Sequence, residues 1–187
     1  MKKILTILVT TVVVATAALA TEPAKKPQNI LGMGKWSIRA FFGFNGGDVK
    51  SDGEVDNIYG AGLEYSLPNV GAGGTNANFA IGAEWNTSSE GLGNLKMDNY
   101  GIYAAGYFGL GQSASMNSLK LLARVGYFNT RYHGSGASDN EWGFGFDAGL
   151  SYKLEKIGIE LFYRQRPSVN DFSNNAIVIG VNFPIGN

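Results

Sequence analysis

The side chains with the greatest capacity for chemistry are three arginines and four carboxylates that lie within apolar or glycine-rich segments. An isolated charge in a nonpolar interior is very costly, so buried groups of this kind must pair or hydrogen-bond. A set of arginines and carboxylates can therefore pair and close the interior of the protein. A gated path for ions or small solutes through that interior is the alternative. We expect two of them to face each other from neighbouring strands, Arg39 and Glu64. The set is Arg39, Arg124, Arg164, Glu64, Glu84, Asp147 and Glu160.

A His-x-Ser element at His133 and Ser135 is the only arrangement suited to nucleophilic chemistry, and His133 is the only histidine. A serine nucleophile needs a base within hydrogen-bond reach and an acid that orients the base. Asp139 or Glu141 could supply that acid. A solvated loop histidine is the favoured interpretation, so we expect no enzyme activity, with a hydrolase as the alternative. The absence of cysteine excludes Cys-dependent metal and nucleophile chemistry, and we expect neither a cofactor nor a metal.

Alternation of apolar residues predicts the elements that carry these side chains. The phase of one further segment, 100–108, is ambiguous, because Tyr103 and Tyr107 are out of phase with its other apolar residues. Polar, glycine-rich connections separate the segments, and none is long enough for a helical crossover, which predicts an antiparallel meander. The segments are 36–44, 59–67, 77–85, 100–108, 119–127, 144–154, 157–163 and 177–183, and the connections are 46–56, 68–76, 87–98, 109–118, 133–141, 155–156 and 167–174.

The opposite face of the same segments is small and charged, and it decides which kind of barrel to expect. The chain has 27 glycines, many of them on this face. A soluble barrel would keep its apolar side chains inside and its charges in water. In a membrane barrel, apolar side chains face lipid and small or polar ones fill the interior. The sequence therefore predicts an all-β, eight-stranded, antiparallel up-and-down transmembrane β-barrel.

The N-terminus has the pattern of a secretory signal peptide. Lys2 and Lys3 precede an apolar run that ends in Ala18-Leu19-Ala20, a small-x-small cleavage pattern. We expect cleavage after Ala20, which divides the chain into a signal peptide (1–20), a periplasmic lead (21–34), the barrel (35–183) and a short C-terminal tail (184–187). Without Lys2 and Lys3 the acidic residues slightly outnumber the basic ones, and no basic stripe marks a nucleic-acid partner.

Aromatic residues mark both ends of the outward face when the N-terminus is placed in the periplasm, as expected for the two girdles of a membrane barrel. The same criterion places Tyr103 and Tyr107 in the lumen. The periplasmic girdle is expected to comprise Trp36, Tyr65, Phe79, Phe108, Tyr152 and Phe183, and the outer girdle Phe44, Tyr59, Trp85, Tyr100, Tyr127, Phe144 and Tyr163.

The signal peptide, the eight alternating segments and the last segment, 177–183, together resemble small OmpA/OmpX-type and opacity-type outer-membrane barrels. The resemblance implies a location in the bacterial outer membrane and a surface or structural role. It implies Phe183 as the signal for the barrel-assembly machinery, and outer-membrane lipid and lipopolysaccharide as surroundings of a monomer. The His-x-Ser element is similar to one in outer-membrane lipid A deacylases, but Gly136 follows Ser135 where that family has asparagine. A porin-like channel is the other alternative.

Overall fold

A computed structural model describes residues 36–46, 57–67, 77–89, 96–110, 119–134, 137–154, 157–169 and 172–185. None of these residues belongs to a helix that is long and apolar enough to cross a membrane. They form the strands β1 (Trp36–Asn45), β2 (Asn57–Ser66), β3 (Ala77–Ser88), β4 (Lys96–Gly109), β5 (Leu119–Gly134), β6 (Ala137–Leu154), β7 (Ile157–Val169) and β8 (Phe172–Ile185).

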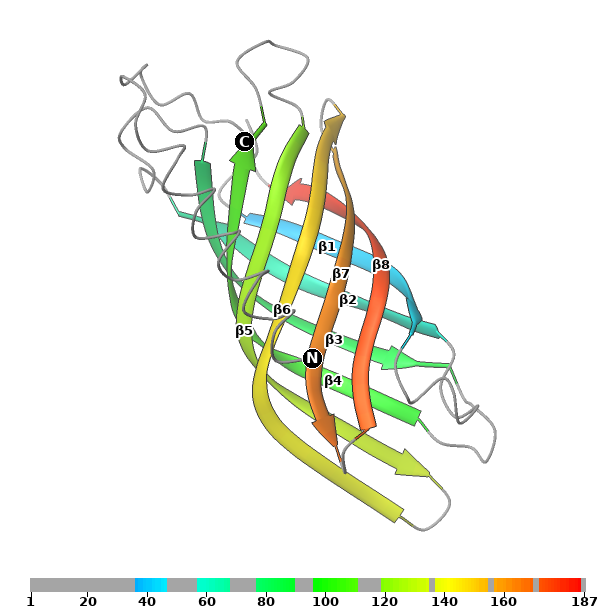
Figure 1. The fold of residues 1–187 in the computed structure, drawn as a ribbon. Coiled ribbons are helices and arrows are strands. Elements are labelled where there is room, and N and C mark those ends of the chain that lie inside the picture. The colour runs from blue at the N-terminus through cyan, green and yellow to red at the C-terminus, as the bar shows by residue number, and fades with distance from the viewer. Residues whose placement is uncertain are drawn as a thin grey trace, which may run out of the picture.

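The strands close into a barrel in the order in which they occur along the chain (Figure 1). Every strand pairs antiparallel with its two neighbours, and β1 closes the barrel against β8, with Trp36 opposite Ile185 and Asn45 opposite Ala176. The predicted all-β, eight-stranded, up-and-down barrel is confirmed. β8 continues through Ile185, and the predicted signal peptide and periplasmic lead lie outside the described residues.

The barrel has two distinct ends. At the terminal end, β1 begins at Trp36 and β8 finishes at Ile185. At the hairpin end, β5 and β6 stay paired as far as Gly134 opposite Ala137, and Figure 1 shows them projecting beyond the other strands.

Two predicted connections are wrong at this end. Most of 133–141 is paired strand. β7 likewise extends through Val169 and β8 begins at Phe172, so most of 167–174 belongs to strands, although a register shift separates the pair Arg166–Asn174 from the pair Val169–Phe172. Alternation of apolar residues stops where strands leave the lipid, whereas backbone pairing continues regardless of side-chain polarity.

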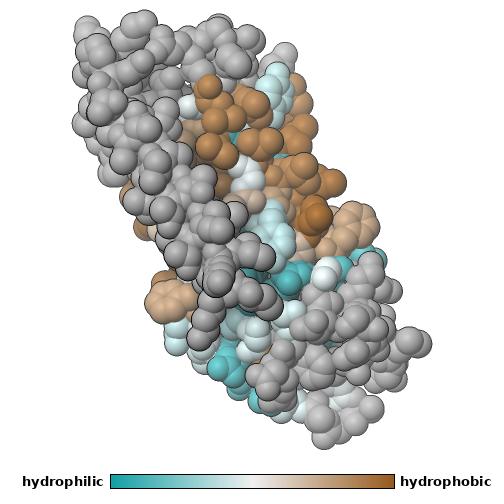
Figure 2. Space-filling view, in the orientation of Figure 1, coloured by the Kyte–Doolittle hydropathy of each residue, from teal (hydrophilic) through white to brown (hydrophobic). Residues whose placement is uncertain are grey.

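The outward face of the strands is apolar, and the inward face is buried. Exposed and buried positions alternate along β1 without exception. Among the large aliphatic side chains that the structure describes, Ile102 at 67% and Ile177 at 58% are the most exposed. Figure 2 shows hydrophobic residues gathered over the upper part of the visible face and hydrophilic residues nearer the hairpin end.

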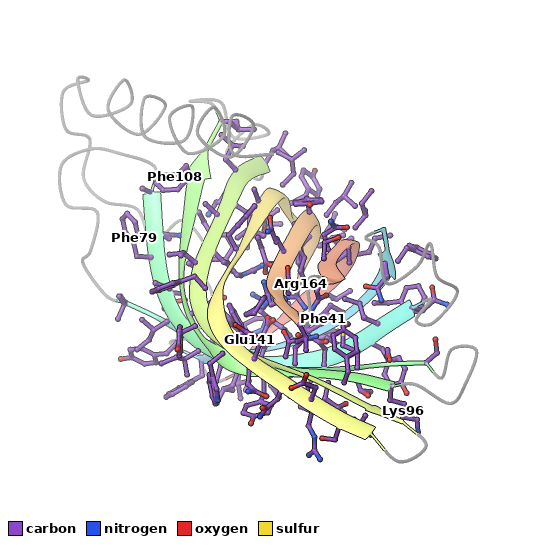
Figure 3. The ribbon with its side chains drawn as sticks, turned by 60° about the horizontal axis from the view of Figure 1, so that its bottom comes forward. Phe41, Phe79, Lys96, Phe108, Glu141 and Arg164 are labelled. Carbon is purple, nitrogen blue, oxygen red and sulfur yellow. The ribbon has the colours of Figure 1, made fainter. Side chains whose placement is uncertain are left out.

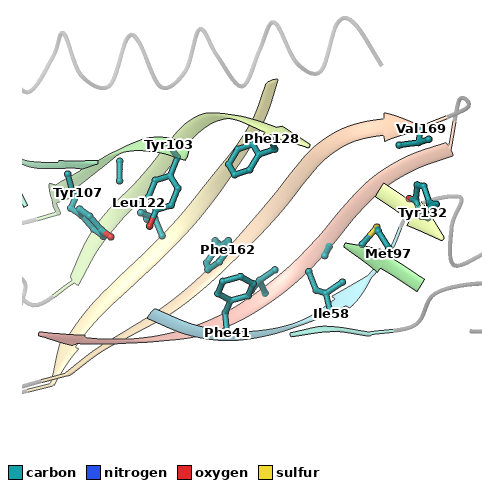
Figure 4. Packing of buried hydrophobic residues seen from close by; sticks show 14 residues of the cluster. Phe41, Ile58, Met97, Tyr103, Tyr107, Leu122, Phe128, Tyr132, Phe162 and Val169 are labelled. Carbon is teal, nitrogen blue, oxygen red and sulfur yellow. The ribbon is translucent and has the colours of Figure 1, made fainter. Parts of the chain in front are cut away.

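The interior is packed along the length of the barrel, from Tyr107 towards the terminal end to Tyr132 and Val169 at the hairpin end (Figure 4). Glycines make room for the inward-pointing rings. A Cβ at Gly82 would lie 2.5 Å from the Tyr103 hydroxyl, and one at Gly126 would lie 2.7 Å from the Phe128 ring. An eight-stranded barrel is only wide enough for side chains to fill it, so the Tyr103 and Phe128 rings fit because the neighbouring positions have no side chain.

Candidate functional site

The middle of the lumen holds a cluster of charged side chains, here called the lumen network. In it, four arginines and four carboxylates of the described residues each expose 5% or less, and their formal charges cancel. Figure 3 shows one of them, Arg164, inside the ring of strands together with Phe41, whereas Phe79 and Phe108 lie at its outer side. The structure brings all seven expected residues together and adds Arg166. The members are Arg39, Glu64, Glu84, Arg124, Asp147, Glu160, Arg164 and Arg166.

Arg166 was not predicted as a lumen residue, because the apolar alternation of its segment ends at Tyr163. The signal that could have found it is phase, since Arg166 lies an even number of positions from Glu160 and Arg164. Side chains at such positions face the same side of a strand.

Arg124 and Arg39 hold one half of the network. Arg124 lies 2.7 Å from Glu160, 3.7 Å from Glu64 and 3.7 Å from Asp147. Arg39 lies 3.3 Å from Glu84 and 3.1 Å from Glu160. Glu160 therefore lies between arginines from two strands, β5 and β1.

The expected facing of Arg39 and Glu64 is wrong. The register places Arg39 opposite Gly62, and Glu64 opposite Ser37, so the two side chains differ in depth by two residues. Glu64 instead accepts hydrogen bonds from the Tyr107 hydroxyl at 2.7 Å and the Tyr103 hydroxyl at 3.1 Å. The expectation assumed that the two strands start at the ends of the connection 46–56, whereas the β1–β2 ladder starts with Phe44 opposite Asn57.

Arg164 and Arg166 share Asp147 and Glu84, the two acids that also link them to Arg124 and Arg39. Arg164 lies 3.2 Å from Asp147 and 2.9 Å from Glu84. Arg166 lies 2.8 Å from Asp147 and 2.5 Å from Glu84. Two guanidinium groups and two carboxylates thus alternate, which offsets the repulsion between the like charges.

Aromatic rings separate and cover the guanidinium groups. The Phe162 ring centroid lies 5.8 Å from the Arg39 guanidinium carbon, 5.2 Å from that of Arg124 and 5.3 Å from that of Arg164. The Arg166 carbon lies 3.9 Å above the Phe128 ring. A cation over a ring face is attracted by the ring quadrupole, so these rings stabilise the charges that they bury. Phe128 and Phe162 were missed because the inward face was read as small and charged.

Polar residues also fill the lumen on the hairpin side of the network. Asn99 donates to Asn86 at 2.9 Å and accepts from Thr130 at 2.6 Å and from Asn174 at 3.0 Å. Towards the terminal end, Lys120 is buried and its Nζ finds no hydrogen-bond partner in the described part of the chain. The lumen is therefore filled along its length.

His133 contacts an acid other than the two expected. Its Nε2 lies 2.8 Å from Asp98 Oδ2, and both side chains are partly exposed. Asp139 and Glu141 lie opposite Tyr132 and Thr130 in the ladder, and Ser135 lies outside the described residues. No group of three or more metal-binding side chains in the described segments could hold an ion.

A family model described as "Outer membrane protein beta-barrel domain" matches residues 6–183. The chain belongs to this family. It is a protein of the bacterial outer membrane, and the lipid bilayer surrounds its apolar outward face. Nothing among curated proteins matches the chain.

Solved structures of other outer-membrane barrels share the fold. The N-terminal β-barrel domain of Pseudomonas aeruginosa OprF is 13% identical, with a TM-score of 0.54, and the match covers 82% of this chain and 99% of that one. Ail, the attachment invasion locus protein of Yersinia pestis, is 14% identical with a TM-score of 0.51 and the same coverage. These likenesses concern architecture alone.

Transmembrane β-barrels carry aromatic residues at the lipid boundary, and this chain has such residues at both ends of its outward face. Trp36 contacts Tyr65 at the terminal end, with ring centroids 4.8 Å apart. Tyr127 contacts Phe144 towards the hairpin end at 5.4 Å. Trp142, which was not predicted as a girdle residue, stacks on Tyr127 and adds to this second group. The outward-facing rings include Phe44, Tyr59, Trp85, Tyr152, Tyr163 and Phe183, all exposed, and Phe79, partly exposed.

Proposed function

We propose that this protein is a scaffold that displays its hairpin end at the cell surface, with a structural or interaction role there, while its lumen is closed by packed side chains. The lumen network is the observation that carries the proposal. Its charges cancel, its members are buried, and rings pack against its guanidinium groups. A neutral, filled lumen suits the bracing of a barrel and is poorly suited to conduction.

The hairpin end supports an interaction role through the ribbon that β5 and β6 form beyond the other strands. Arg131, Asp139, Asn140 and Glu141 are exposed on it. These residues are polar and of mixed charge, which suits solvent and polar partners. Ail, the attachment invasion locus protein of Yersinia pestis, is an example of a small barrel named for such a role.

The partners that we propose follow from the position of the barrel in the outer membrane. Outer-membrane lipid and lipopolysaccharide contact the outward face of a monomer. The barrel-assembly machinery recognises β8, with Phe183 as the aromatic signal residue. Phe183 is exposed and lies opposite Ile38 of β1. Phe183→Ala is expected to lower the fraction of protein that becomes heat-modifiable in cells, whereas Phe44→Ala, at the other end of β1, is the matched control.

Cysteine labelling tests the orientation, because the chain contains no cysteine of its own. Asn140→Cys in the ribbon is expected to react with a membrane-impermeant maleimide on intact cells. Leu154→Cys, exposed at the terminal end of β6, is expected to react only after the outer membrane is opened. The reverse pattern would place the hairpin end in the periplasm and end the surface proposal.

Conductance in planar bilayers tests the closed lumen. The wild type is expected to show no steady ionic current, and ribbon removal by deletion of residues 131–140 is expected to leave that result unchanged. A current that Glu84→Gln or Glu160→Gln opens or closes would replace the scaffold with a small channel. Loss of an acyl chain from lipid A after expression, detected by mass spectrometry, would replace it with a hydrolase.

A further inference from the structure

On the outward face of β4, β5 and β6, the paired residues form rungs, each with one residue from every strand. Three successive rungs change from apolar to polar towards the hairpin end. The rung Ile102–Tyr127–Phe144 is followed by Tyr100–Asn129–Trp142 and then by Asp98–Arg131–Asn140. Successive rungs on one face are about 7 Å apart. The boundary between the hydrocarbon of the bilayer and its headgroups therefore lies within this short distance on these strands.

Asn129 lies at that boundary in an unusual environment. It is an outward-facing residue, two positions from Tyr127, yet it is 0% exposed, and neither its amide nitrogen nor its amide oxygen has a hydrogen-bond partner among the described residues. The Tyr100 and Trp142 rings on either side of it lie 5.5 Å apart, edge to face. Burial of a polar amide without hydrogen-bond partners is unfavourable. A ligand that donates to and accepts from the Asn129 amide would remove this cost, which favours its binding.

The covering rings are able to admit such a group. Tyr100 and Trp142 are both exposed on their outer sides, and rotamer changes of exposed side chains are fast. Tyr127 stacks on Trp142 with an angle of 16° between the planes. The stacked pair forms a flat aromatic platform beside the amide.

A cation lies on the next rung. Arg131 is exposed and donates from Nε to the Ser138 hydroxyl at 3.3 Å. The carboxylate opposite it, Asp98, is bound by His133 at 2.8 Å. A guanidinium group on the water side of an aromatic boundary is suited to a phosphate group.

We propose that this face binds the phosphorylated glycolipid of the outer leaflet, lipopolysaccharide. A phosphate of the headgroup contacts Arg131, and a sugar hydroxyl or amide enters between Tyr100 and Trp142 to satisfy Asn129. The acyl chains lie against the rung below, where Phe144 is 79% and Ile102 is 67% exposed. A soluble sugar would leave that apolar surface uncovered. Because the surface is continuous with the lipid-facing band, an amphipathic molecule fits this face better than a soluble sugar. The inference rests on the proposed orientation, with the hairpin end outermost.

Retention of purified lipid A in mixed micelles, measured by native mass spectrometry, tests the proposal. The wild type is expected to retain lipid A over phosphatidylglycerol. Arg131→Gln and Asn129→Ala are each expected to weaken this retention by about tenfold, the effect of losing one good polar contact to a charged or buried group. Lipid A without its phosphates is expected to bind the wild type as weakly as the phosphorylated form binds Arg131→Gln.

Matched variants separate this site from general lipid contact and from misfolding. Trp85→Phe changes an exposed girdle residue on β3, and Asn140→Ala changes a polar residue next to Arg131. Both are expected to retain lipid A like the wild type, and gel mobility before and after boiling shows that every variant is folded. Equal retention by all folded variants would overturn the proposal. A wrong orientation would appear in the Asn140→Cys labelling and not in this measurement.

Discussion

Arg124 Nη2 donates to both carboxylate oxygens of Glu160, at 2.7 Å and 2.8 Å. The two residues belong to β5 and β7, which are not neighbours in the barrel. Arg39 on β1 similarly reaches Glu84 on β3. The lumen network therefore joins strands that no backbone ladder connects, and it braces the barrel across its width.

Because the lumen network braces the barrel, removing one member of an ion pair is expected to lower the stability more than removing both members. Glu160→Gln is expected to lower the free energy of unfolding by about 3–5 kcal/mol, because it leaves Arg124 and Arg39 buried with less compensating charge. Adding Arg124→Met is expected to recover much of that loss. Urea unfolding in phospholipid vesicles measures both variants. Additive losses would show that the two side chains act independently.

The close approach of Gly82 to Tyr103 predicts that even a methyl group is harmful there. Gly82→Ala is expected to cost about 1–3 kcal/mol, the typical penalty for overpacking. Gly46→Ala is the control, because its nearest neighbouring atom would lie 3.5 Å from the added Cβ. Thermal unfolding in detergent compares the two. An unchanged Gly82→Ala protein would mean that the Tyr103 ring can move aside.

The depth of an outward-facing residue in the bilayer determines how much a charged substitution there destabilises the barrel. Val125 is 57% exposed on the outward face of β5, beside Ala104 and Phe146. Val125→Arg is expected to cost about 2–4 kcal/mol in vesicles, the range for a cation near the middle of the membrane. Asn140→Arg in the ribbon is expected to cost almost nothing. Similar losses for both variants would contradict the placement of the lipid band.

Lys120 predicts a gain in stability on mutation. Its ammonium group is buried without a hydrogen-bond partner in the segments that the structure describes. Lys120→Met keeps the length of the side chain and removes the polar group, so it is expected to raise the free energy of unfolding by about 1–3 kcal/mol. Lys153→Met, at a half-buried position on β6, is expected to have a smaller effect. A loss of stability with Lys120→Met would reveal a partner for the ammonium group.

The architecture could be predicted because the bilayer imposes a strict period on the chain. Lipid contact requires apolar residues at every second position, as at Ile177, Ile179 and Val181, and this pattern is visible without any structure. The phase of the segment with Tyr103 and Tyr107 also followed, because only one phase completes the girdles. Both tyrosines lie in the lumen.

The contacts inside the lumen could not be predicted in the same way. Which arginine meets which carboxylate depends on the stagger between strands, as the separation of Arg39 from Glu64 illustrates. Alternation specifies the face of a residue but contains no information on relative register. The length of the β5–β6 ribbon was missed for a related reason, since residues such as Arg131 and Asn140 pair through their backbones outside the lipid.

The pairing of Trp36 with Ile185 has a consequence for the timing of assembly. β8 completes the barrel and is synthesised after the other seven strands, so until then the edge of β1 has unsatisfied peptide groups. Hydrocarbon cannot hydrogen-bond to such groups, and a half-built sheet is therefore not tolerated within it. The membrane must receive the chain as one unit, and a polypeptide that stops short of β8 has no stable inserted form.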